Sequence, residues 1–118
     1  MFGHYLKSKI HRATITSTNL NYEGSIEIDQ ELLTTAKIGH YEKVQVLNLS
    51  NGNRFETYAI PAPTGSGKIA LAGPAARLGQ VNDLVIIISY AILNVDETDG
   101  YKPVVVLLDH DNRIISSK

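Results

Sequence analysis

Short, closely spaced segments of alternating apolar and polar residues constrain the fold of this chain more than any other feature. Residues 13–18, 43–49 and 54–60 alternate and are rich in β-branched or aromatic side chains, which is typical of strands that bury one face. The Asn51-Gly52 pair predicts a hairpin with a type I′ turn between the last two segments, because both central residues of that turn need positive φ. Short strands at this spacing indicate a closed or nearly closed β-barrel.

Other segments predict further short elements. Two continuous apolar runs, residues 84–88 and 104–108, predict strands that are buried on both faces. Asp29 is expected to cap the beginning of a short helix that ends at Gly39. Shorter strands are expected at 26–28, 68–71 and 113–115, and a single helical turn at 73–78.

Length and composition exclude several classes of protein. The 118 residues fit a single domain, and the formal net charge of −1 provides no broad basic surface for nucleic acid or an anionic membrane. No apolar stretch approaches the roughly 20 residues of a membrane span, and no signal peptide is visible. The chain has no cysteine, and its four histidines lack the spacing of a zinc site, so we expect no metal. We expect a soluble, cytoplasmic protein.

Four groups of residues are less generic than the rest of the sequence. Residues 9–12 contain three basic side chains, and residues 21–25 read Asn-Tyr-Glu-Gly-Ser at a predicted strand boundary. The other two groups are residues 51–58 and residues 72–76. Each group taken alone fits an ordinary turn, a solvated charge or an amphipathic strand.

Taken together, the four groups resemble the aspartate 1-decarboxylase family in order, spacing and position. The matching residues are Lys9-Ile10-His11-Arg12, Asn21-Tyr22-Glu23-Gly24-Ser25, Ile28-Asp29, Asn51-Gly52, Arg54, Thr57-Tyr58-Ala59-Ile60, Gly73, Ala75-Ala76 and 79–87. The resemblance extends from residue 6 to about residue 108. It implies a mainly β fold, a six-stranded double-psi β-barrel with short helices in a single domain, and a homotetramer with active sites between subunits.

The resemblance also implies a reaction, the pyruvoyl-dependent decarboxylation of L-aspartate to β-alanine and CO₂ in pantothenate biosynthesis. Ser25 attacks the carbonyl of Gly24, and the chain is cut into residues 1–24 and residues 25–118. Ser25 then becomes the covalently bound pyruvoyl cofactor. A glycine before the serine suits this attack, because it has no Cβ and tolerates a strained backbone. Thr57 is expected to donate a hydrogen bond to the oxyanion formed in the attack.

In turnover, the substrate amine forms a Schiff base with the pyruvoyl group. Lys9 and Arg54 are expected to bind the carboxylates of the substrate, and Tyr58 is expected to protonate the carbanion. The other residues assigned to the pocket are Thr57, Gly73, Pro74 and Ala75, with His11 and Tyr22 in supporting positions. The family usually has Asn-Gly-Ala where this chain has Ala72-Gly73-Pro74, so one side-chain amide and one backbone donor are missing near the reactive centre.

Two alternatives stay open at the level of sequence. The first is a non-catalytic β-barrel binding module that has kept the fold without the activity. The second is a related pyruvoyl decarboxylase that acts on glutamate or another acidic amino acid. The sequence also leaves open whether self-cleavage is spontaneous or needs a maturation partner.

Overall fold

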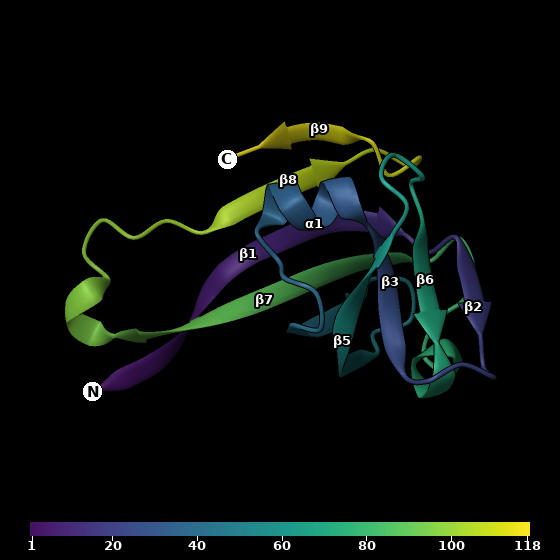
Figure 1. Ribbon diagram of the computed structural model, residues 1–118, viewed down its shortest axis with the longest axis horizontal. Helices are drawn as coiled ribbons and strands as arrows, with labels where there is room; N and C mark the ends of the chain where they lie inside the picture. Colours follow the sequence, from purple (N-terminus) through teal and green to yellow (C-terminus); the bar gives the residue numbers. More distant parts are fainter.

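Nine strands form one continuous sheet in the computed structural model, which describes residues 1–118 (Figure 1). They are β1 (Phe2–Thr14), β2 (Ser17–Asn19), β3 (Ser25–Asp29), β4 (Lys43–Asn48), β5 (Arg54–Ala62), β6 (Ile69–Ala72), β7 (Leu84–Asn94), β8 (Val104–Leu108) and β9 (Ile114–Ser117). Their hydrogen-bonded order is β2-β6-β3-β5-β4-β7-β1-β8-β9. The prediction of a mainly β fold with short helices in a single domain is confirmed.

Strands β1 and β2 connect one end of this sheet, β2, to its other half, where β1 lies between β7 and β8. They are separated only by Ile15 and Thr16, yet β1 pairs with β7 and β8 whereas β2 pairs with β6. The Ile15 amide donates to the Asp83 carbonyl over 2.9 Å, and the Thr16 amide donates to the Ile69 carbonyl over 2.7 Å. The sheet therefore curls into a small barrel. The single strand expected over residues 13–18 is wrong, because the chain changes partners at residues 15 and 16.

Alternating strand residues fill the interior of the barrel. The largest fully buried side chains on the strands are Ile10, Ile26, Ile28, Val44, Val46, Ile69, Leu71, Val85 and Ile87. The prediction that residues 84–88 and 104–108 are buried on both faces is wrong for the single chain. Val85, Ile87 and Val106 point inward, but Ile86 and Ile88 lie half-buried on the outer face of the sheet.

A short helix, α1 (Gln30–Ala36), packs against β1 and β8 (Figure 1). The predicted cap is confirmed, because the Asp29 carboxylate accepts a hydrogen bond from the Glu31 amide over 2.9 Å. The predicted end at Gly39 is wrong. Lys37 ends the helix in the left-handed conformation, with φ of 59°.

The β4–β5 hairpin is confirmed, but its turn differs from the predicted one. Leu47 pairs with Arg54, and the Asn48 amide donates to the Asn53 carbonyl over 2.8 Å, so the loop has more than two residues. Gly52 has φ of 80°, whereas Asn51 does not have positive φ. A type I′ turn needs positive φ at both central residues, so the prediction of that turn is wrong.

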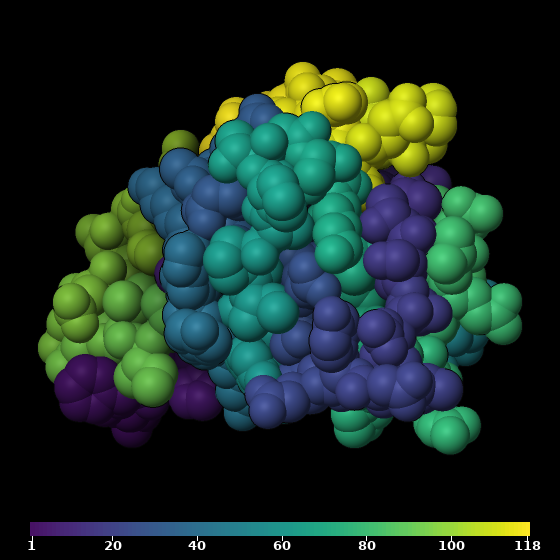
Figure 2. Space-filling view, turned by 45° about the vertical axis from the view of Figure 1, so that its right-hand side comes forward, coloured from purple at the N-terminus to yellow at the C-terminus, as the bar shows by residue number.

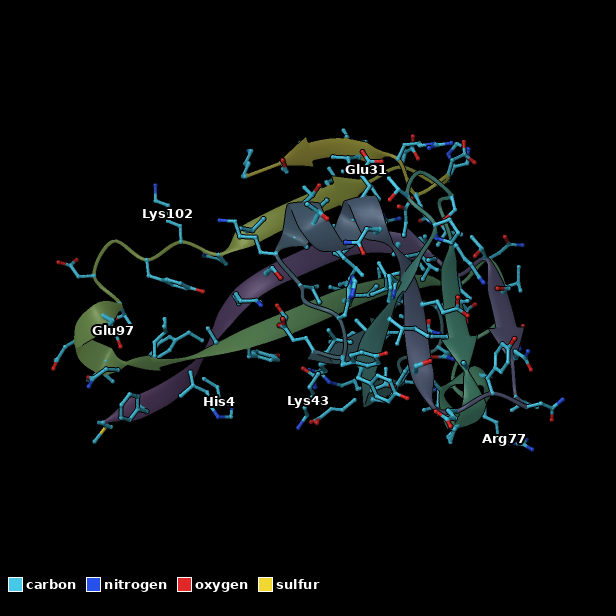
Figure 3. The ribbon with its side chains drawn as sticks, viewed as in Figure 1. His4, Glu31, Lys43, Arg77, Glu97 and Lys102 are labelled. Atoms are coloured by element: carbon cyan, nitrogen blue, oxygen red, sulfur yellow. The ribbon has the colours of Figure 1, made fainter.

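Strands β1 and β7 extend beyond the barrel as a two-stranded arm (Figure 1). The N-terminal residues of this arm lie at the lower left of the molecular surface in Figure 2. Phe2 pairs with Asn94 at its tip, and the 3-10 helix η2 (Val95–Glu97) follows, with Glu97 at the far end of the molecule from Arg77 (Figure 3). Phe2 and Ile92 are 68% and 67% exposed on this arm. None of the helices is long and apolar enough to cross a membrane.

Candidate active site

The Gly24-Ser25 peptide lies where an exposed segment enters the sheet. Ser25 is the first residue of β3 and is 3% exposed, so the predicted strand boundary is confirmed. Strand β3 pairs with β5 on one side and with β6 on the other, where Ser25 lies opposite Ala72. The Ser25 hydroxyl donates a long hydrogen bond of 3.5 Å to the Glu23 carbonyl, so it stays close to the peptide that precedes it.

The beginning of the 3-10 helix η1 (Gly73–Arg77) packs directly on this peptide. Gly73 has φ of 66°, and a Cβ on it would lie 2.6 Å from the Tyr22 carbonyl oxygen and 2.7 Å from the Gly24 nitrogen. A Cβ on Gly24 would in turn lie 3.3 Å from Cδ of Pro74. Only glycine satisfies both the backbone angle and the space at residue 73. The backbone of Gly73 therefore packs tightly against the segment before Ser25.

A hollow of about 550 Å³ opens beside Ser25. It is lined by Asn21, Tyr22, Glu23, Ser25, Glu27, Tyr41, Tyr58, Ile60 and Ala72. Ser25 and Tyr58 meet there because β3 and β5 are neighbours, with Ile26 opposite Ala59. Ala72 lines the hollow opposite Ser25, where the family's usual asparagine would place an amide.

Tyr41 and Glu27 line this hollow although the sequence analysis gave neither of them a role, and Tyr41 lies against the predicted proton donor. Tyr41 comes from the loop between α1 and β4, and its ring centroid lies 6.2 Å from that of Tyr58. No periodicity or motif in the sequence marks this position.

The wall of this hollow contains acidic side chains and no basic one. Glu23 and Glu27 line it, and Glu27 is paired over 3.0 Å with Lys68. Arg54 is exposed and stands four residues before Tyr58 on β5, which is roughly 13 Å along the strand. Lys9 lies on β1, three strands away from β5 and therefore roughly 14 Å across the sheet. A single chain does not bring Lys9 or Arg54 to Ser25.

Lys9 belongs to a broad outer face of the sheet. Its strand neighbours are Ile88 on β7 and Val105 on β8, and Ile88 in turn lies opposite Gln45 on β4. The apolar side chains on this face are half-buried in the single chain; they are Leu47, Ile86, Ile88, Val105 and Leu107. The face is thus partly apolar, and basic side chains stand on it.

His11 lies beside Lys9 in a distorted part of β1. The register with β7 shifts between Ile10 and Ala13, and Arg12 has φ of 65°, which marks a β-bulge. The Nδ1 atom of His11 is buried and has no hydrogen-bond partner. Burial lowers the pKa of His11, and the nearby charges of Lys9 and Arg12 lower it further. Both effects favour the neutral form of the His11 side chain.

Three further residues assigned from the sequence lie next to the hollow but do not line it. Thr57 is half-buried on β5 opposite Val44, and the Ala75 side chain is 6% exposed and packs in the core. Pro74 is exposed and meets Gly24 through its ring. No group of three or more His, Asp or Glu side chains is arranged to hold a metal ion.

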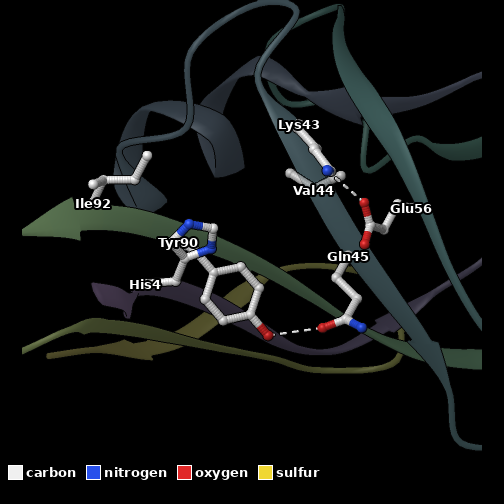
Figure 4. A pocket seen from close by; sticks show the side chains of 7 residues that line it. All are labelled: His4, Lys43, Val44, Gln45, Glu56, Tyr90 and Ile92. Carbon is white, nitrogen blue, oxygen red and sulfur yellow. Dashed lines mark hydrogen bonds and ion pairs between the residues drawn. The ribbon is translucent and has the colours of Figure 1, made fainter. Parts of the chain in front are cut away.

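A second hollow, of about 540 Å³, lies at the base of the arm (Figure 4). His4, Tyr90 and Ile92 line it from the arm, and β4 and β5 complete it. The Tyr90 hydroxyl donates to Gln45 Oε1 over 2.7 Å, and Lys43 pairs with Glu56 over 2.6 Å. Four of its polar side chains are thus paired with one another, and Ser25 does not belong to it.

Comparisons with known proteins agree in one family. The model of the aspartate decarboxylase family matches residues 1–115. The chain is 60% identical to an aspartate 1-decarboxylase of Pelotomaculum thermopropionicum, over 98% of this chain and 87% of the relative. It is 57% identical to one of Acaryochloris marina, over 94% of this chain and 85% of the relative. It is 51% identical to one of Desulfotalea psychrophila, over 97% of this chain and 96% of the relative.

Proposed function

The chain belongs to the aspartate decarboxylase family, and from this premise we propose how its own residues perform the reaction. The protein is a carboxy-lyase that decarboxylates L-aspartate to β-alanine and CO₂, a step of pantothenate biosynthesis. The observation that supports our residue assignment is the hollow shared by Ser25 and Tyr58, with Gly73 packed on the peptide before Ser25.

The first stage of the proposal is self-cleavage. Ser25 Oγ attacks the carbonyl carbon of Gly24, and the amide becomes an ester. Elimination then releases a chain that ends in the Gly24 carboxylate and leaves dehydroalanine at residue 25. Hydrolysis releases ammonia and leaves a pyruvoyl group. The buried serine, the glycine before it and the Gly73 contact all fit this group, and Thr57 is proposed to stabilise the oxyanion.

The two products of cleavage are residues 1–24 and residues 25–118. Strand β1 lies in the smaller fragment and is hydrogen-bonded to β7 and β8 of the larger one. Strand β2 of the smaller fragment pairs with β6. These ladders keep the fragments together after the bond is cut.

The second stage is turnover in the hollow. The pyruvoyl carbonyl supplies an electron sink for the carbanion that remains when CO₂ departs. Tyr58 is proposed to donate the proton to that carbon, because its ring lines the same hollow as residue 25. The backbone of Gly73, Pro74 and Ala75 and the side chain of Tyr22 are proposed to support the substrate from the rim. His11, which lies beside Lys9, is proposed to support it from another copy of the chain.

The charges of the substrate and of the hollow support an assembly of several copies of the chain. Aspartate carries two carboxylates, but the acidic groups of the hollow are those of Glu23 and Glu27. Lys9 and Arg54 must therefore come from another copy of the chain. The half-buried apolar outer face around Ile88 gives a second copy a surface to cover. We therefore propose a homotetramer with the active site between subunits, in the cytoplasm.

Two variants test this proposal. Ser25→Ala removes the nucleophile, so that protein should fold, remain one chain and be inactive. Tyr58→Phe keeps the ring without its proton, so it should still be cut at Gly24, with kcat lowered by about 10²–10⁴-fold. Intact mass spectrometry measures cleavage, and borohydride reduction with aspartate measures whether substrate becomes attached to residues 25–118.

The results separate the alternatives. A parent protein that stays one uncut, inactive chain would be the non-catalytic binding module. Faster turnover of glutamate than of aspartate would show a related decarboxylase. If the Tyr58→Phe protein remained uncut, Tyr58 would have a role in self-cleavage. Cleavage of the purified protein without any addition would show that no maturation partner is needed.

A further inference from the structure

Tyr41 has a backbone conformation that large side chains seldom adopt. Its φ is 66°, in the left-handed region that favours glycine and asparagine. The loop is fixed there by two hydrogen bonds to β5, from the Tyr41 amide to the Ala59 carbonyl over 2.7 Å and from the Ala59 amide to the Glu42 carbonyl over 3.0 Å. Both bonds lie next to Tyr58 in the sequence. The loop is therefore tied to the part of β5 that carries Tyr58.

Core packing does not explain why a tyrosine stands at this position. The Tyr41 side chain is 75% exposed and belongs to no buried cluster. Its ring instead lies against that of Tyr58, with centroids 6.2 Å apart and planes inclined by 38°. This distance falls in the range of attractive aromatic pairs. Strained residues that persist without a packing reason concentrate at functional sites.

We propose that Tyr41 is a positioning residue for Tyr58. Its ring restricts the orientation of the Tyr58 ring and holds the phenol over the hollow that contains residue 25. The inference rests on the proposed role of Tyr58 as proton donor. A proton donor must lie within hydrogen-bond reach of the atom it protonates, and a displacement of about 1 Å can cost about 10²-fold in rate.

The experiment compares three variants of the purified, self-cleaved protein. Tyr41→Asn removes the ring and introduces a residue that suits positive φ. Tyr41→Phe keeps the ring. Lys37→Asn relieves the same kind of strain elsewhere, because Lys37 has φ of 59° and is exposed away from the hollow. For each protein, mass spectrometry measures cleavage, and steady-state kinetics with aspartate give kcat and KM. Calorimetry gives the unfolding midpoint.

We expect cleavage to be complete in all three variants, because Tyr41 does not contact Gly24. Tyr41→Asn should lower kcat by about tenfold or more with KM within about twofold. Its unfolding midpoint should stay at or slightly above the parental value, because the relief of strain offsets the loss of the ring pair. Tyr41→Phe should retain most of the parental kcat. Lys37→Asn loses no ring pair, so it should raise the midpoint by about 3 °C without a change in kcat.

A purely structural role for Tyr41 would move activity and stability in the same direction. Parental kcat in Tyr41→Asn would overturn the proposal, and so would a fall in kcat accompanied by a lower unfolding midpoint. An equal fall of kcat in Tyr41→Phe would also overturn it, because the ring would then not be the active part. A parent protein without decarboxylase activity would refute the proposed function itself, and this inference with it.

Discussion

Replacing Gly73 by alanine tests whether the contact between η1 and the Gly24 peptide controls self-cleavage. The new methyl group would lie 2.6 Å from the Tyr22 carbonyl oxygen, 2.7 Å from the Gly24 nitrogen and 2.9 Å from the Gly24 Cα. All three neighbours are backbone atoms of the segment that Ser25 attacks. They cannot move aside as a flexible side chain would.

The displacement that this methyl group requires sets the size of the effect. Unstrained heavy-atom contacts lie at about 3.5 Å, so the segment must retreat by roughly 0.8 Å. A misplacement of about 1 Å in a near-attack geometry costs about 10²-fold in rate. The positive φ of residue 73 adds about 1–2 kcal/mol of strain to the folded chain. We therefore expect Gly73→Ala to fold less stably and to cleave itself about a hundredfold more slowly.

The assay follows the appearance of the two fragments by denaturing electrophoresis and mass spectrometry after rapid purification. Gly100→Ala is a matched control, because Gly100 has φ of 77° but nothing within 4 Å of an added Cβ. It should carry the same backbone strain and cleave at the parental rate. If Gly73→Ala cleaved as fast as Gly100→Ala, the contact with Gly24 would have no part in maturation.

Two further predictions concern the basic groups. Arg54→Ala should weaken aspartate binding by about 2–5 kcal/mol, or about thirtyfold to several-thousandfold in KM, whereas an unchanged KM would show that Arg54 is a solvated surface charge. Because the folded protein holds the pKa of His11 below its ordinary 6.5, the unfolded chain binds more protons there, and the free energy of unfolding should fall as the pH drops through 6.5. His11→Asn should remove this part of the pH dependence in thermal unfolding between about pH 7.5 and pH 5, and an unchanged slope would contradict the assignment.

The alternation of residues predicted the strands whose register is regular. The segment 43–49 became β4, and inward residues such as Val44 and Val46 are those the pattern marks. Residues 2–12 of β1 were not predicted, because bulges interrupt the alternation of this strand. Ser8 and Ile10 point inward before the bulge, but Ala13 does so after it. Because the inward-pointing residues of β1 change from even-numbered to odd-numbered positions, its sequence shows no continuous alternation of apolar and polar residues.

The turn after β4 shows how tertiary contacts override a local signal. The side-chain amides of Asn48, Asn51 and Asn53 all donate to the Leu78 carbonyl, over 3.3, 3.1 and 3.2 Å. This carbonyl lies just after η1, far from the hairpin in sequence. The loop is shaped by these contacts and not by the local preference of Asn-Gly for a type I′ turn. No pattern within the hairpin itself contains that information.

The site was predictable only where the residues follow the family pattern. The resemblance identified Ser25 and Tyr58, which the structure brings into one hollow. It gave no indication of Tyr41, whose conformation depends on hydrogen bonds to Ala59 on another strand. Lys9 and Arg54 were assigned to the same pocket, but one chain keeps them apart. In the assembly that we propose, packing between copies would bring Lys9 and Arg54 to Ser25, and the alternation of residues in the sequence contains no record of such contacts.

The exposed segment before Gly24 in the uncut chain also affects what happens at this site after cleavage. Residues 20–23 are exposed and belong to no strand, and the last strand before them, β2, has only three residues. The contact with Gly73 is therefore the main restraint on Gly24. We expect the carboxylate that cleavage forms at Gly24 to stand next to the Glu23 carboxylate, and neighbouring like charges repel one another. This repulsion should weaken the contact that holds Gly24 for attack, and so free the hollow at residue 25 for substrate.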